Sequence, residues 1–175
     1  MKILLTGGGT GGHFYPITAV AQALYDLTEE ERLLGPQLIL MADKKYDSEL
    51  LDKLGIKFRQ IPAGKVRRYF SLLNLTDIFK TAVGILKSVF VVYSEMPDVI
   101  FGKGGYVSFP PLLAARIFGI PTVIHESDSV PGKINKWAGK FAKRIAISFP
   151  EAAKYFPKEK TALTGTPIRK GLSGS

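Results

Sequence analysis

The 175-residue sequence contains no cysteine, which excludes disulfide bonds and every metal or iron–sulfur site that needs thiolate ligands. It also has only two histidines, His13 and His125, so we expect no histidine-rich metal centre. A chain without cysteine is typical of a reducing cytoplasm.

Long hydrophobic runs are missing as well. The first residues, MKILLTGGG, have too short an apolar part for a signal peptide. No stretch reaches the roughly 18 uninterrupted apolar residues that a transmembrane helix needs, because polar residues interrupt even the most apolar segment, residues 72–93. We therefore expect a soluble domain that touches a membrane only at its surface.

Acidic residues are few, 15 against 24 basic ones, which gives a net charge of +9. The hydrophobic share of 46% and the charged share of 22% are those of a globular domain and exclude a disordered chain or a coiled coil. Basic charge also suits nucleic acid. Nothing in the sequence resembles a DNA- or RNA-binding module, so we expect no nucleic-acid partner.

Short apolar runs alternate with amphipathic stretches, a pattern that predicts an α/β fold with a doubly wound, Rossmann-like parallel sheet. Runs such as ILL, LIL and TVI are continuously hydrophobic, as in strands covered by helices on both faces. The predicted strands are Lys2–Thr6, Gln37–Met41, Lys57–Ile61, Val99–Phe101, Thr122–Ile124, Ile145–Ile147 and Thr161–Leu163. The predicted helices lie near Ile17–Leu27, Ser48–Leu54, Thr76–Tyr93, Pro110–Phe118 and Lys133–Phe141. In such a fold the ligand lies at the carboxyl ends of the strands.

A glycine-rich loop, TGGGTGGH at residues 6–13, follows the first predicted strand and precedes a helix. Glycine lets the backbone turn sharply and lets its N–H groups approach a ligand closely. The partial positive charge of the helix N-terminus suits a phosphate or pyrophosphate. Gly7, Gly9 and Gly12 fit the dinucleotide-binding fingerprint, but a loop with this many glycines fits almost any spacing. A tight turn without a ligand is the alternative.

Two further motifs are predicted at the same edge of the sheet. The sequence GKGGYVS at residues 102–108 follows the fourth strand, where Lys103 would neutralise charge. Tyr106 would either contact a sugar or pack against the next helix. The sequence HESD at residues 125–128 follows the fifth strand, so that His13 and His125 would both reach one cleft.

Four motifs together resemble the MurG family of bacterial N-acetylglucosaminyltransferases, in glycosyltransferase family 28. They are GGGTGGH, GKGGYVS, HE with PGKINKW, and LTGTPIR. The resemblance implies the N-terminal half of a two-domain GT-B fold, with residues 1–170 as the acceptor-binding domain. Residues 171–175 would form a hinge or linker tail, and the C-terminal donor domain would be absent. The chain alone would then be inactive.

The implied reaction transfers GlcNAc from UDP-GlcNAc to the 4-hydroxyl of undecaprenyl-pyrophosphoryl-MurNAc-pentapeptide, with inversion and without a cofactor or metal. This is the step from lipid I to lipid II in peptidoglycan synthesis. UDP-GlcNAc would bind mainly through the absent domain.

The resemblance also implies roles for individual residues. His13 is the expected general base, because imidazole accepts a proton near neutral pH, and Glu126 is a second catalytic candidate or orients His13. Asp128 stands where the family usually has Asn, and its carboxylate would be unfavourable beside a phosphate unless protonated or paired. The implied substrate-binding residues are Thr10, Gly11, Gly12, Gly104, Gly105, Tyr106, Asp128 and Arg169.

A basic and apolar segment, residues 57–91, carries seven basic residues and one acidic residue. Its predicted helix has a wide apolar arc, which is either core or a contact surface. We predict a peripheral contact with the anionic cytoplasmic face of the plasma membrane. The contact residues would be Arg67, Arg68, Phe70, Phe79, Lys80 and Leu86.

Two other functions are compatible with parts of the pattern. One is the acceptor half of another GT-B glycosyltransferase that acts on a different lipid acceptor. The other is a free-standing NAD-binding domain of an oxidoreductase, in which Asp43 would bind the ribose. The oxidoreductase alternative leaves the second glycine loop and the HE and GTPIR motifs unexplained.

Overall fold

The computed structural model describes residues 1–8, 11–64 and 73–168. Within these residues, seven parallel strands form one sheet in the order β3-β2-β1-β4-β5-β6-β7. All seven predicted strands and the α/β fold class are confirmed. The strands are β1 (Lys2–Thr6), β2 (Gln37–Ala42), β3 (Lys57–Gln60), β4 (Val99–Gly102), β5 (Thr122–Glu126), β6 (Arg144–Ile147) and β7 (Thr161–Leu163).

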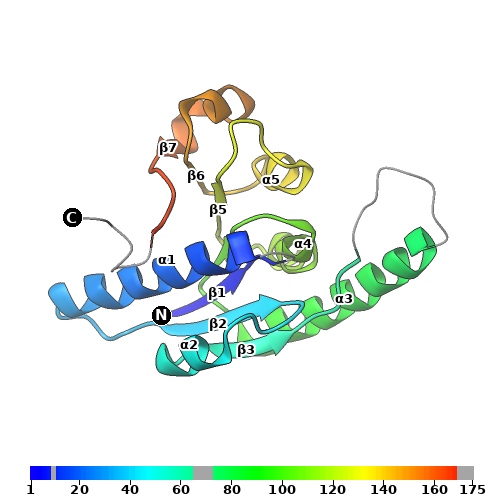
Figure 1. The fold of residues 1–175 in the computed structure, drawn as a ribbon, viewed down its shortest axis with the longest axis horizontal. Helices are drawn as coiled ribbons and strands as arrows, with labels where there is room; N and C mark the ends of the chain where they lie inside the picture. The colour runs from blue at the N-terminus through cyan, green and yellow to red at the C-terminus, as the bar shows by residue number, and fades with distance from the viewer. Residues whose placement is uncertain (9–10, 65–72, 169–175) are drawn as a thin grey trace.

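Helices cover the sheet, and β1 and β2 lie between the two long helices α1 and α3 in Figure 1. The sheet centre is fully buried, with Leu4, Leu5 and Leu40 all at 0% exposure. The α-helices are α1 (Gly11–Glu30), α2 (Ser48–Lys53), α3 (Leu73–Glu95), α4 (Phe109–Ile117) and α5 (Lys133–Ala138). Short 3-10 helices, which the sequence did not predict, are η1 (Tyr106–Ser108), η2 (Pro150–Tyr155) and η3 (Lys158–Lys160).

Helix α1 begins at Gly11, six residues before the predicted start at Ile17. The prediction placed the start directly after Pro16. The helix continues through Pro16, which lies inside it and removes one backbone hydrogen bond. The glycine motif therefore forms the first helical turn, whose N–H groups have no partner within a helix.

Helix α3 presents its apolar arc to solvent. Phe79, Leu86 and Phe90 are 71%, 72% and 69% exposed. The side that faces the protein buries the small or polar Gly84 and Ser88 in the middle of the helix, and the apolar Val91 and Val92 near its end. A β-carbon on Gly84 would lie 2.0 Å from the Pro62 carbonyl oxygen, so the helix packs closely against the loop after β3. The interpretation of the arc as core is therefore wrong.

No helix within the described residues has both the length and the apolar character needed to cross a bilayer.

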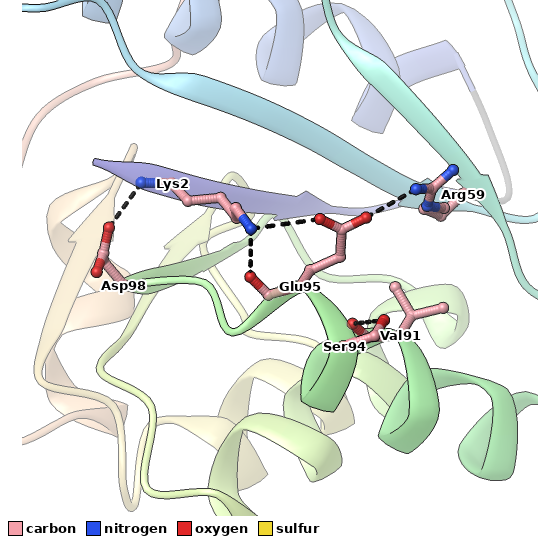
Figure 2. Close-up of polar contacts among 6 residues, drawn as sticks. All are labelled: Lys2, Arg59, Val91, Ser94, Glu95 and Asp98. Atoms are coloured by element: carbon pink, nitrogen blue, oxygen red, sulfur yellow. Dashed lines mark hydrogen bonds and ion pairs between the residues drawn. The ribbon is translucent and has the colours of Figure 1, made fainter.

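The end of α3 is tied to the sheet by a group of charged residues (Figure 2). Glu95 accepts a hydrogen bond from Arg59 of β3 at 2.7 Å and contacts the Lys2 ammonium of β1 at 3.4 Å. The backbone N–H of Lys2 donates to the Asp98 carboxylate at 2.6 Å. The Arg59 hydrogen bond lowers the pKa of Glu95, as does that of Lys2, and burial opposes them. These contacts join β1, β3 and α3.

Candidate functional site

Three neighbouring strands bring the predicted motifs to one edge of the sheet. Thr6 at the end of β1 pairs with Gly102 of β4, and Gly102 pairs with Ile124 of β5. The chain continues from these strands into the first glycine loop, the GKGGYVS loop and the HESD segment. All three segments therefore begin side by side, and the start of α1 belongs to the first of them.

Two glycines allow these loops to approach one another. Gly105 has φ +82°, and a β-carbon there would lie 2.8 Å from the Gly8 carbonyl oxygen. The same β-carbon would be 3.5 Å from Cε1 and Nε2 of His13, so the imidazole ring lies against Gly105. Gly104 has φ +92° and would place a β-carbon 2.8 Å from Nδ2 of Asn135. Glycine at these positions brings α1, the β4 loop and α5 together.

His13 is half-buried at this junction. Burial is the main cause that lowers its pKa, and the positive charge of Lys103 lowers it further. The carboxylates of Asp128 and Glu126 act in the opposite direction. The net shift favours the neutral imidazole, which is the form that accepts a proton.

Glu126 is 4% exposed and organises the loop that follows β5. Its Oε1 accepts a hydrogen bond from the Asp128 N–H at 3.0 Å, and its Oε2 accepts one from the Gly132 N–H at 3.1 Å. Oε2 also accepts from the Asn135 amide at 2.9 Å, and that amide donates to the His125 carbonyl oxygen at 3.1 Å. Sequence reasoning did not single out Asn135, although it lies in the PGKINKW motif.

Lys103 is 1% exposed, whereas the sequence suggested a charge that faces a ligand. Its Nζ donates a hydrogen bond to the Ser127 hydroxyl at 2.9 Å. Burial lowers the pKa of Lys103, and the nearby Glu126 and Asp128 carboxylates oppose that shift.

His125 is also buried, at 1% exposure, and its contacts lie toward β6 and β7. Its Nε2 is 2.9 Å from the Gly165 carbonyl oxygen and 3.4 Å from the Ser148 hydroxyl. Thr166 donates a hydrogen bond to the same Ser148 hydroxyl at 2.8 Å. His125 therefore anchors the segment after β7 and does not face an open edge together with His13.

Tyr106 contacts Asp43, the residue that follows β2. The Tyr106 hydroxyl donates to Oδ2 of Asp43 at 3.2 Å. Burial and the Asp43 carboxylate raise the pKa of Tyr106 to about 12, so the hydroxyl stays protonated. The acidic residue required by the NAD-binding alternative is thus engaged by a protein side chain.

The remaining predicted residues have different positions. Gly11 and Gly12 form the first turn of α1, and Asp128 is exposed beside it in charge range of His13. Phe79, Lys80 and Leu86 are exposed on α3. Thr10, Arg67, Arg68, Phe70 and Arg169 lie outside the described residues.

Comparison with known proteins matches this chain to a glycosyltransferase family. The model of the glycosyltransferase family 28 N-terminal domain matches residues 3–147. The curated UDP-N-acetylglucosamine--N-acetylmuramyl-(pentapeptide) pyrophosphoryl-undecaprenol N-acetylglucosamine transferases of Clostridium tetani and Borrelia turicatae are 40% and 42% identical over 171 and 174 residues. Each match covers 98% of this chain, but 46% and 47% of the respective relative.

Among solved structures, the crystal structure of Acinetobacter baumannii MurG has a TM-score of 0.71 and 28% sequence identity. The match covers 99% of this chain and 47% of that chain. The fold is thus that of the N-terminal half of a GT-B protein, and the chain spans about half the length of the relatives it matches.

Proposed function

Because the chain belongs to glycosyltransferase family 28, as its N-terminal domain, we propose that it is the acceptor-binding domain of a hexosyltransferase in peptidoglycan synthesis. The acceptor is undecaprenyl-pyrophosphoryl-MurNAc-pentapeptide, and the transferred sugar is GlcNAc from UDP-GlcNAc. The observation that carries this proposal is the contact between the His13 ring and Gly105, which joins the first turn of α1 to the β4 loop. The curated names of relatives about 40% identical support the substrate pair.

The acceptor's pyrophosphate fits the N-terminus of α1. This helix is 20 residues long, so its first turn carries a full helix-terminal partial charge and N–H groups without helical partners. Thr10, Gly11 and Gly12 would contact the pyrophosphate there. Gly104, Gly105, Tyr106 and Asp128 would surround the sugar. At the exposed Asp128, a sugar hydroxyl is a better partner than a phosphate, because its carboxylate repels negative charge.

His13 acts as the general base in the proposed reaction. It removes the proton from the acceptor 4-hydroxyl while that oxygen attacks the anomeric carbon of GlcNAc. The bond to UDP breaks on the opposite side, and its electron pair leaves with UDP, so the configuration inverts. Glu126 positions the β5 loop, because both of its oxygens already accept hydrogen bonds from that loop or from Asn135.

UDP-GlcNAc is held mainly by a second, donor-binding domain, with Arg169 contributing near the connection between the domains. The relatives are about twice as long as this chain, which leaves room for such a domain. The chain alone should then bind the acceptor without catalysing transfer.

The protein works as a peripheral protein at the cytoplasmic face of the plasma membrane. The exposed arc of α3 supports this location, because Phe79, Leu86 and Phe90 lie on the same helix as the exposed Lys80 and Lys87. Apolar side chains can enter the interface between headgroups and acyl chains, and lysines are attracted to anionic headgroups.

Calorimetric titration of the chain with a soluble short-prenyl pyrophosphoryl-MurNAc-pentapeptide tests the acceptor assignment. We expect binding of this analogue, about tenfold weaker binding by His13→Ala, and little binding of UDP-GlcNAc. The exposed Leu34→Ser variant, on the loop after α1, is the control and should bind normally. Tight NAD binding without an acceptor response would overturn the proposal. If an analogue without the MurNAc-pentapeptide binds equally well, the proposed acceptor would be a different lipid.

A further inference from the structure

Within the described residues, Lys103 is the one lysine or arginine that is buried. A lysine is almost never fully buried unless its charge is compensated or used, because removing an ammonium group from water is costly. The ion pairs found in the described part of the chain both involve Glu95, far from Lys103 in the fold, and Lys103 takes part in neither. Its charge is instead offset by the nearby carboxylates of Glu126 and Asp128.

The position of Lys103 links three loops of the site. Its backbone N–H donates to the Thr6 carbonyl oxygen at 2.8 Å. A β-carbon on Gly7 would lie 3.0 Å from Cβ of Lys103, so the side chain starts directly beside the first glycine loop. Its Nζ ends at the Ser127 hydroxyl, 2.9 Å away, on the loop after β5. The side chain thus runs from the α1 side of the site to the β5 side.

The groups around Lys103 are the ones that surround His13. Glu126 and Asp128, both after β5, interact electrostatically with Lys103 and with His13. Lys103 itself, after β4, is the cation in charge range of the imidazole. The loop that carries Lys103 reaches His13 directly, because a β-carbon on Gly105, two residues after Lys103, would lie 3.5 Å from the imidazole ring. Two carboxylates and one ammonium group are therefore in charge range of His13, and the ammonium is the group that disfavours a second positive charge there.

We propose that Lys103 is a positioning residue, which fixes the Ser127 loop and sets a positive charge beside His13 so that the imidazole stays available as a proton acceptor. This inference rests on the proposed role of His13 as the general base. Without the ammonium group, His13 would face two carboxylates alone and would bind a proton more tightly. Protonated imidazole cannot remove the acceptor proton, so transfer would be lost at the acidic end of the pH range.

Proton NMR titration of the His13 Cε1–H in the chain tests this electrostatic role without any need for activity. The signal is identified by its absence from His13→Ala, and the far-ultraviolet circular dichroism spectrum of each variant checks that it is folded. Lys103→Gln removes the charge but keeps an N–H donor for Ser127. We expect it to increase the proton affinity of His13 about threefold or more, whereas Lys103→Arg should stay near the wild type.

Two further variants separate charge from structure. Ser127→Ala removes the hydrogen bond and keeps the ammonium group, so the His13 titration should not move. Lys103→Met/Ser127→Ala leaves no unpaired polar group behind and tests the charge if Lys103→Gln does not fold. An unchanged His13 titration in a folded, uncharged Lys103 variant would overturn the inference.

A second measurement tests whether the charge of Lys103 affects the transfer reaction. The chain is joined to the remaining, donor half of the Borrelia turicatae relative, and kcat/KM is followed against pH. Lys103→Gln should move the acidic limb of the profile to higher pH, while the rate at the alkaline plateau changes less than threefold. If the NMR shift occurs but wild-type transfer is absent, the proposed function fails and the electrostatic role of Lys103 stands. If transfer occurs and neither measurement responds, the inference fails alone.

Discussion

At the scale of single residues, the site depends on a backbone conformation that only glycine adopts easily. Gly105 has φ 82° and ψ 162°, a region where any β-carbon is strained. The Gly8 carbonyl oxygen also occupies the space that a side chain would need, at 2.8 Å from a β-carbon. Gly119 offers a comparison within the same chain, because it has φ +66° and open space around it.

We predict that Gly105→Ala destabilises the domain by about 3 kcal/mol, the sum of backbone strain and the displacement of Gly8. Gly119→Ala should cost only about 1 kcal/mol, since it has strain but no collision. Urea unfolding of the two variants measures both values. If both variants lose the same free energy of unfolding, the collision with Gly8 adds nothing to the cost of Gly105→Ala.

The sequence reveals residues of the site whose type is unusual, and misses those whose contacts are long-range. Glycine motifs and a scarce histidine stand out in any chain, so Gly105 and His13 were predictable. The hydrogen bond of Asn135 to Glu126 and that of Lys103 to Ser127 join residues 9 and 24 positions apart. Their geometry depends on how β4, β5 and α5 pack, which no local pattern encodes.

At the scale of elements, α3 has an apolar outer side, although its inner side buries small and polar residues as well as Val91 and Val92. Gly84 and Ser88 are buried, while Phe79 and Leu86 are among its most exposed residues. In most surface helices the apolar side faces the protein. Here the outer side of α3 keeps apolar surface that a membrane can cover.

The double variant Phe79→Ser/Leu86→Ser should bind vesicles that contain phosphatidylglycerol about tenfold or more weakly than the wild type, because two apolar side chains no longer enter the interface. Co-sedimentation with vesicles measures the bound fraction. The matched control is Leu34→Ser, a substitution of an apolar residue that is 93% exposed elsewhere. Wild-type pelleting that is negligible, or equal with and without anionic lipid, would contradict the membrane contact.

Strands β1, β2 and β5 were predictable because each contains a continuous apolar run, which suits a sheet covered on both faces. The helices were less predictable than the strands. The start of α1 was misplaced because the helix continues through Pro16 and includes the glycines before it. The orientation of α3 was not predictable from its apolar residues, since the close contact between Gly84 and Pro62 lies on the side that faces the protein.

At the scale of the whole molecule, Glu95 joins parts of the chain that are far apart in sequence. Lys2 of β1 and Arg59 of β3 both contact its carboxylate at the end of α3 (Figure 2). The Glu95 side chain is only 13% exposed, which limits screening by water, whereas Arg59 is 46% exposed. The pair is thus partly protected and should contribute modestly to stability.

Glu95→Gln should lower the free energy of unfolding by about 1 kcal/mol at neutral pH. The pKa of Glu95 is lowered on folding from its usual 4.5, so its contribution is complete above that pH. The contribution is lost as the pH falls through the folded-state pKa. Urea unfolding at a series of pH values should therefore show the two proteins converging in acid. A difference that persists or grows there would be inconsistent with this ion pair.

The order of the strands also governs how the domain can form during synthesis. Strand β1 pairs with β2 on one side, but its other neighbour, β4, ends at residue 102. A nascent chain shorter than this leaves one edge of β1 with open N–H and C=O groups, although that strand lies in the interior of the finished sheet. The ribosome must deliver the chain as far as β4 before this edge is closed, so the emerging polypeptide passes through a stage with an unprotected hydrophobic strand.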